Sequence, residues 1–92
     1  MQEKRLKLQK AIADVIKENR VKSITKSADE IGMGKTIWAD LENGVKDPQL
    51  STFWRIAEGL NLKPCQLLKM VEDKIGKDFS FSDDEEALKR LH

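Results

Sequence analysis

Apolar residues recur three and four positions apart along most of this 92-residue chain, which is the spacing that keeps side chains on one face of an α-helix. A first helix is predicted from about Glu3 to Asn19, because its apolar residues share one face and Lys and Asp residues stand between them. That face consists of Leu8, Ala11, Ile12, Val15 and Ile16.

Two stretches in the second half of the chain show the same spacing. A fourth helix is predicted between residues 50 and 60, after a turn that contains Pro48. A fifth helix opens at Lys63-Pro64, where the missing N–H of proline costs nothing, and ends at Gly76. The expected apolar faces are Leu50, Phe53, Ile56, Ala57 and Leu60 in the fourth helix and Leu67, Leu68, Val71 and Ile75 in the fifth.

Two shorter helices are predicted between the first and the fourth, with a glycine-containing turn between them. The earlier one covers residues 27–31, and the later one covers residues 35–42 and stops at Asn43-Gly44, residue types that accept the left-handed conformation. A helix of about two turns is marginal in water, so its neighbours must hold it through the apolar ridge of Trp38 and Leu41. This spacing alone also suits a connector helix in a bundle. A helix, a glycine turn and a second helix with a polar face together form the helix-turn-helix pattern.

Three runs of the chain carry a family resemblance: residues 27–33, residues 41–48 and residues 50–60. Together they resemble the Cro/cI-type helix-turn-helix DNA-binding domain, the lambda repressor-like or xenobiotic-response-element family. The resemblance covers roughly Leu6 to Met70, and its most specific part is the spacing between Leu41-Glu-Asn-Gly44 and the following helix. It implies an all-α, five-helix DNA-binding domain.

The resemblance also implies which residues face DNA. In the family, the second helix of the motif enters the major groove. Lysine there can donate to guanine, a threonine methyl or an alanine can meet the thymine methyl, and aspartate can accept from cytosine N4. The matching base-facing positions are Lys35, Thr36, Ala39 and Asp40. The carboxylate of Asp40 would face a polyanion. It is therefore either a specificity element or a sign that this helix contacts few bases.

Phosphate contacts are expected around the same helix. Ile37 stands where the family commonly has a small polar residue, so it packs on the helix flank or meets a thymine methyl. The candidates for phosphate contact are Lys26, Asn43, Gly44 and Lys46, with Gly44 presenting backbone N–H groups. Each lysine taken singly is also consistent with a solvated surface charge.

The chain departs from the family near the start of the second helix. Ser23, Thr25 and Ser27 are all possible N-caps, and Ile24 stands where the family has a phosphate-binding Gln, which leaves Lys26 as the nearest replacement. The family also pairs a basic residue late in the first helix with a Glu after the recognition helix's last apolar position. Here the matching positions are Lys17 and Glu42, although arginine suits such a carboxylate better than lysine does.

The chain is expected to divide into a DNA-binding domain over residues 1–76 and a short C-terminal extension over residues 77–92. The extension contains Phe79 and Phe81 and then a capping-box pattern from Ser82 to Glu85, followed by the apolar stripe of Ala87, Leu88 and Leu91. It either packs on its own domain or contacts a second subunit or another protein.

Composition narrows the class of protein. The formal net charge is only +1, but residues 1–26 carry eight Lys and Arg against three acids, so a basic face can meet a polyanion. No apolar run approaches the roughly 18 residues of a membrane span and no signal-peptide core follows the basic start, so a cytoplasmic protein is expected. One cysteine, Cys65, and a single C-terminal histidine predict no metal site and no cofactor. Cys65 is either a small packing residue or a redox switch.

Two functions from different classes follow. The first is a sequence-specific transcriptional regulator that binds double-stranded operator DNA as a homodimer. The alternative is a protein-interaction module, such as an antitoxin or phage-type control protein, whose tail holds a partner and whose DNA binding is secondary. An enzyme is not expected, because no His, Cys or carboxylate constellation has the form of a catalytic site.

Overall fold

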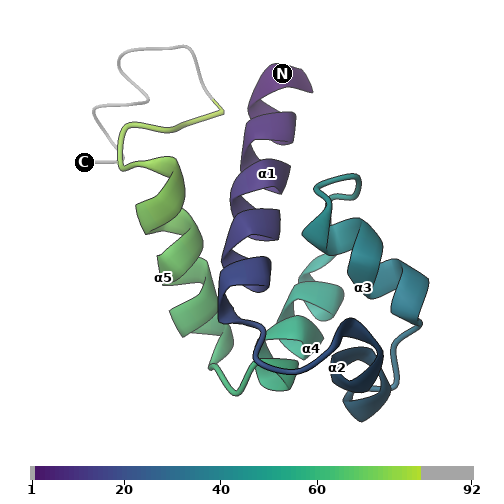
Figure 1. The fold of residues 1–92 in the computed structure, drawn as a ribbon. Helices are drawn as coiled ribbons and strands as arrows, with labels where there is room; N and C mark the ends of the chain where they lie inside the picture. The colour runs from purple at the N-terminus through teal and green to yellow at the C-terminus, as the bar shows by residue number, and fades with distance from the viewer. Residues whose placement is uncertain (1, 82–92) are drawn as a thin grey trace.

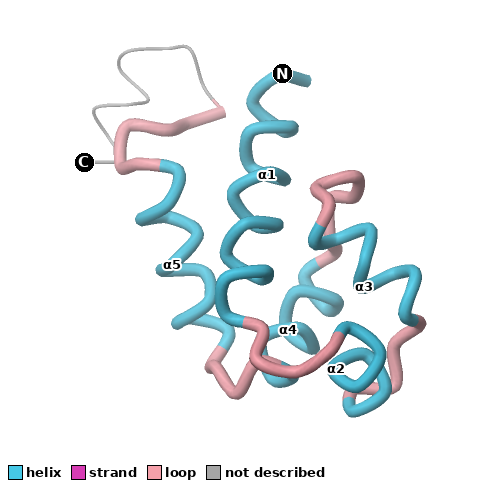
Figure 2. Tube along the Cα trace, viewed as in Figure 1, coloured by secondary structure: helices cyan, strands magenta, loops and turns pink. Residues whose placement is uncertain are grey.

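The computed structural model describes residues 2–81, and within them the chain forms five α-helices and no strand (Figures 1 and 2). The expectation of an all-α, five-helix domain is confirmed. The helices are α1 (Gln2–Asn19), α2 (Ile24–Glu30), α3 (Lys35–Glu42), α4 (Leu50–Gly59) and α5 (Pro64–Ile75).

The first helix is the centre of the arrangement. Figure 1 shows α1 lying between α5 on one side and α3 on the other, and both neighbours contact it. The shorter helix α2 packs on α3 and α4, while α4 also contacts α5. The short helix α3 is therefore held from two sides, as its length requires.

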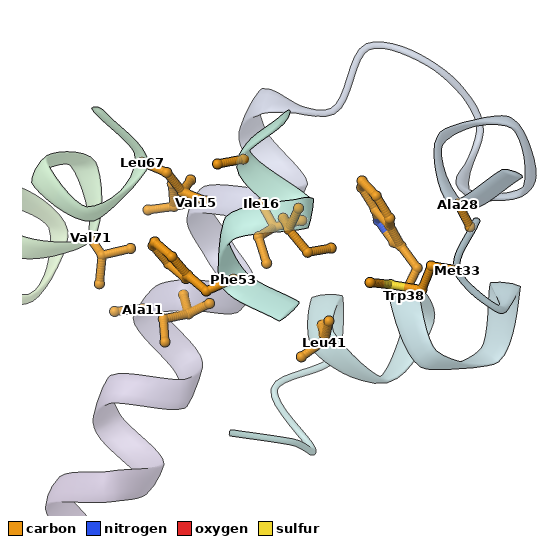
Figure 3. Packing of buried hydrophobic residues seen from close by; sticks show 13 residues of the cluster. Ala11, Val15, Ile16, Ala28, Met33, Trp38, Leu41, Phe53, Leu67 and Val71 are labelled. Atoms are coloured by element: carbon orange, nitrogen blue, oxygen red, sulfur yellow. The ribbon is translucent and has the colours of Figure 1, made fainter. Parts of the chain in front are cut away.

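One apolar cluster joins all five helices (Figure 3). Trp38 is fully buried within it, and the α1 residues Val15 and Ile16 are only 2% and 1% exposed. The apolar face predicted for α1 is confirmed, with Leu8 partly buried at its edge. The other buried members are Ala11, Ile12, Ala28, Met33, Leu41, Phe53, Ile56, Ala57, Leu67 and Val71.

Two residues expected on the apolar faces of α4 and α5 lie outside the core. Leu50 is 73% exposed because it is the first residue of α4, beyond the turn that contacts the cluster. Leu68 is 52% exposed because it stands one position, or about 100° around the helix, from the buried Leu67. Placing both in the core was wrong, whereas Phe53, Ile56 and Ala57 are buried as expected.

The helices α2, α3 and α4 end in the same hydrogen-bonded motif. After α3, Gly44 N–H donates to the Leu41 carbonyl at 3.3 Å and Val45 N–H to the Asp40 carbonyl at 3.1 Å, which is the Schellman pattern. Gly44 has the positive φ of 71° that this ending requires. Asn61 takes the same place after α4 with a φ of 61°, a conformation that asparagine tolerates better than most residues.

The start of α2 is settled among its three candidate caps. The Ser23 hydroxyl oxygen accepts from the backbone N–H of Lys26 at 3.1 Å, so α2 begins at Ile24. The helix predicted over residues 27–31 therefore starts three residues earlier than expected. Ser27 is buried rather than capping.

The extension begins by packing on its own domain. The rings of Phe79 and Phe81 meet edge to face with centroids 5.4 Å apart, and the Lys7 ammonium of α1 lies 5.8 Å from the Phe79 centroid. The capping box and apolar stripe predicted from Ser82 onward lie outside the described residues. No helix of the described chain is long and apolar enough to cross a membrane.

Candidate nucleic-acid interface

The helix-turn-helix unit is built from α2, a turn over residues 31–34, and α3. Gly32 takes a φ of 65° and its N–H donates to the Asp29 carbonyl, while Met33 N–H donates to the Ala28 carbonyl. Ala28 is fully buried, so its small side chain lets α3 pack close to α2. Met33 is also buried, and it anchors the turn to the core.

Helix α3 presents two chemically different faces. Trp38, Leu41 and Glu42 are buried. Lys35 and Thr36 are exposed, and Ala39 and Asp40 are half-buried. All four predicted base-facing residues therefore lie on the outward part of one helix, as the sequence pattern indicated.

Ile37 also lies outward and is 44% exposed. Its side chain leans back over the turn, since a Cβ built on Gly34 would lie 3.7 Å from Ile37 Cδ1. It is an apolar group within an otherwise polar surface.

The loop after α3 rests on α1. A Cβ added at Gly44 would lie 3.7 Å from Ala13 Cβ and 3.8 Å from Lys10 Cα, which shows how closely the loop approaches that helix. Asn43 and Lys46 are exposed beside it. Three of the four predicted phosphate contacts thus lie together at the C-terminal end of α3.

The fourth candidate, Lys26, lies elsewhere in the motif. Its side chain is exposed in the first turn of α2. Within residues 2–81 it forms no side-chain ion pair.

An ion pair that the sequence pattern does not signal joins the two candidate sets. The Lys46 ammonium lies 3.6 Å from Asp40 Oδ2, and the two side chains are 54% and 32% exposed. The family resemblance assigns Asp40 to bases and Lys46 to phosphates, but in the structure the two side chains contact each other.

The predicted pairing of Lys17 with Glu42 is wrong. Lys17 is exposed on α1, and the partner is Arg20, which follows the end of that helix. Arg20 Nε donates to Glu42 Oε2 at 2.6 Å and Nη2 donates to Oε1 at 3.3 Å. The planar guanidinium matches both carboxylate oxygens at once, and the preference of such carboxylates for arginine was the available signal.

Glu42 accepts a further hydrogen bond from Trp38 Nε1 at 2.5 Å. This carboxylate is 4% exposed and belongs to the last turn of α3, so its partners are needed to offset the cost of burial. Arg20 also donates to the Lys22 carbonyl at 2.6 Å. The network therefore ties α3 to the segment that leads into α2.

Arg55 is a second positioning residue that the sequence analysis missed. From α4, its Nη2 donates to the carbonyls of Ile31 at 2.5 Å and Gly32 at 3.1 Å. These carbonyls belong to the turn between α2 and α3. Arg55 thus connects α4 to the turn of the helix-turn-helix unit and holds that turn in place.

No group of three or more metal-ligating side chains occurs among residues 2–81. Cys65 is exposed at the start of α5, so the interpretation of it as a packing residue is wrong.

No protein-family model matches this chain, and comparisons with curated proteins and with solved structures also gave no match.

Proposed function

We propose that this protein binds double-stranded DNA sequence-specifically through α3 and acts in the cytoplasm as a transcriptional regulator. The observation that carries the proposal is the pairing of α2 and α3 through a tight turn, with the apolar side of α3 buried and its polar side outward. A helix inserted into the major groove needs both properties. Its position must be fixed from behind, and its exposed side chains must remain able to hydrogen-bond.

In this function Lys35, Thr36, Ala39 and Asp40 face base edges. Lys35 donates to guanine O6 and N7, while Thr36 and Ala39 offer methyl groups to thymine. Ile37 adds a further apolar contact at the start of the helix. Asp40 is an acceptor for the exocyclic amine of cytosine.

Lys26, Asn43, Gly44 and Lys46 contact phosphates on either side of the groove. Such contacts set the register of the protein on the duplex and supply much of the affinity. Arg20 and Arg55 contact no DNA in this scheme. They hold α3 and the turn in place.

Operator recognition requires two copies, because one helix-turn-helix unit reads only half a site. Dimers of this kind read two half-sites roughly 34–36 Å apart. We assign the homodimer interface to α5 and the C-terminal extension, where Leu68 and Phe81 are 52% and 44% exposed. The extension is also the surface through which another protein would bind.

The protein-interaction module stays a second candidate because α4 offers another exposed apolar surface besides the extension. Leu50 and Trp54, one helical turn apart, are 73% and 52% exposed and line a shallow apolar depression with Ser51 and Arg55. Exposed aromatic and aliphatic side chains that cluster in this way are typical of protein-binding surfaces.

A selection of bound sites from random duplex DNA tests the proposal. We expect enrichment of a two-half-site sequence and steep salt dependence of its binding. Enrichment of no sequence would contradict the proposal and favour the interaction module.

Two lysine variants test the assigned roles in the same assay. Lys35→Ala should relax the preference at one base position, at a cost of about 1–3 kcal/mol. Lys26→Ala should weaken binding to all sequences alike and reduce the salt slope by about one unit. Lys17→Ala removes the same charge from an exposed position on α1, outside the residues assigned to DNA and to the dimer interface, and serves as the control.

A further inference from the structure

The contact between Asp40 and Lys46 lies within the surface assigned to DNA. Asp40 belongs to the second turn of α3, and Lys46 follows in the loop. Lys46 Nζ lies 3.6 Å from Asp40 Oδ2. A carboxylate in this position repels the phosphates of any duplex, unless a cation or a base donor offsets its charge.

We propose that Asp40 and Lys46 form an exchangeable pair that couples one phosphate contact to the reading of one base. This inference rests on the proposed function. In the free protein the two side chains neutralise each other. On a cognate duplex the cytosine N4 amine takes the place of Lys46 at the Asp40 carboxylate, and the released ammonium binds a phosphate.

The backbone favours an exchange of side chains alone. Val45 N–H donates to the Asp40 carbonyl at 3.1 Å, so the segment that carries Lys46 is tied to the residue that it pairs with. The adjoining Gly44 rests on α1. The two side chains can therefore change partners while α3 and its loop stay in place.

The pair is also weak enough to exchange. Both side chains are partly exposed, and ion pairs of this kind contribute little to stability because water and salt screen them. By contrast, Arg20 and Glu42 form a largely buried, two-point contact that has no reason to open.

The consequence is discrimination by sequence. Where the duplex offers no cytosine amine, opening the pair would leave Asp40 unpaired beside phosphates, so the pair stays closed and Lys46 does not bind a phosphate. Where the amine is present, both new contacts form together. A single wrong base then removes two interactions instead of one.

The test compares salt slopes on the selected duplex and on a random duplex. For the wild-type chain, the slope of log K against log salt should be about one unit steeper on the selected duplex. The variant Asp40→Ala should lose the cytosine preference at one position. It should also steepen the slope on random DNA by about one unit, because Lys46 is freed there. In the double variant Asp40→Ala and Lys46→Gln, the salt slope on random DNA should return to the wild-type value.

A matched control is the ion pair of Lys22 and Glu30 beside α2, in which Lys22 Nζ lies 2.7 Å from Glu30 Oε1. Glu30→Ala also frees a lysine, but it should leave base preference unchanged. If the wild-type chain selects a site and Asp40→Ala keeps every base preference and the same slopes, the exchange is refuted while the proposed function stands. Failure of the wild-type chain to bind any duplex would refute both.

Discussion

Arg20 and Glu42 are 22 positions apart in the sequence, yet the guanidinium of the first donates to both carboxylate oxygens of the second, at 2.6 and 3.3 Å. Glu42 also accepts a hydrogen bond from the indole N–H of Trp38, which is fully buried. One carboxylate thus connects the end of α1, the end of α3 and the largest buried side chain.

Arg20→Met should lower the free energy of unfolding by about 3 kcal/mol, because it leaves the Glu42 carboxylate buried without its cation. Lys17→Met is the control and should change that free energy by less than about 0.5 kcal/mol. Urea unfolding of these variants and of Glu42→Gln, combined as a double-mutant cycle, measures the coupling. Additive effects of Arg20→Met and Glu42→Gln would contradict the network.

Gly44→Ala should destabilise the protein by about 1–2 kcal/mol, because its φ of 71° disfavours any residue with a Cβ. Steric overlap is not the cause, since the nearest atom would lie 3.7 Å from the new Cβ. Asn61→Gly, at a similar φ, should change stability by less than about 0.5 kcal/mol. Thermal and urea unfolding give both values, and equal losses would show that φ is not what matters at these helix ends.

The two tryptophans should respond differently to a neutral quencher, because Trp38 is fully buried and Trp54 is 52% exposed. Trp54→Phe should leave a fluorescence signal that acrylamide quenches poorly. In the wild-type chain the readily quenched fraction belongs to Trp54. If that fraction falls as protein concentration rises, Trp54 lies in a contact between subunits.

Deleting residues 78–92 should keep the helical circular dichroism signal, because α5 ends at Ile75. Sedimentation should show a shift toward monomer at micromolar concentration, since Phe79 and Phe81 are removed. Binding to a two-half-site operator should weaken more than binding to a half-site. If the mass and the operator affinity do not change, the extension does not form the dimer interface. It then packs only on its own domain, where Phe79 contacts Lys7.

Local features of this chain could be predicted from the sequence alone. Helix periodicity depends on residues three and four positions apart, so all five helices and the outward polar side of α3 follow from the pattern. The left-handed endings at Gly44 and Asn61 are also local. They depend on the conformational freedom of one residue and on backbone hydrogen bonds within a span of six consecutive residues. The outward placement of Lys35, Thr36, Ala39 and Asp40 on one helix is local for the same reason, whereas their assignment to bases came from the family resemblance.

Only the tertiary structure decided which side chains meet across helices. Whether Lys17 or Arg20 reaches Glu42 depends on how the end of α1 approaches α3, because positions three apart lie on the same side of a helix and the spacing alone does not distinguish them. The exposure of Leu50 and Leu68 depends on how far neighbouring helices extend over α4 and α5. The contact of Asp40 with Lys46 depends on the path of the loop over α1. Such contacts arise from packing between distant segments, which hydrophobic spacing does not encode.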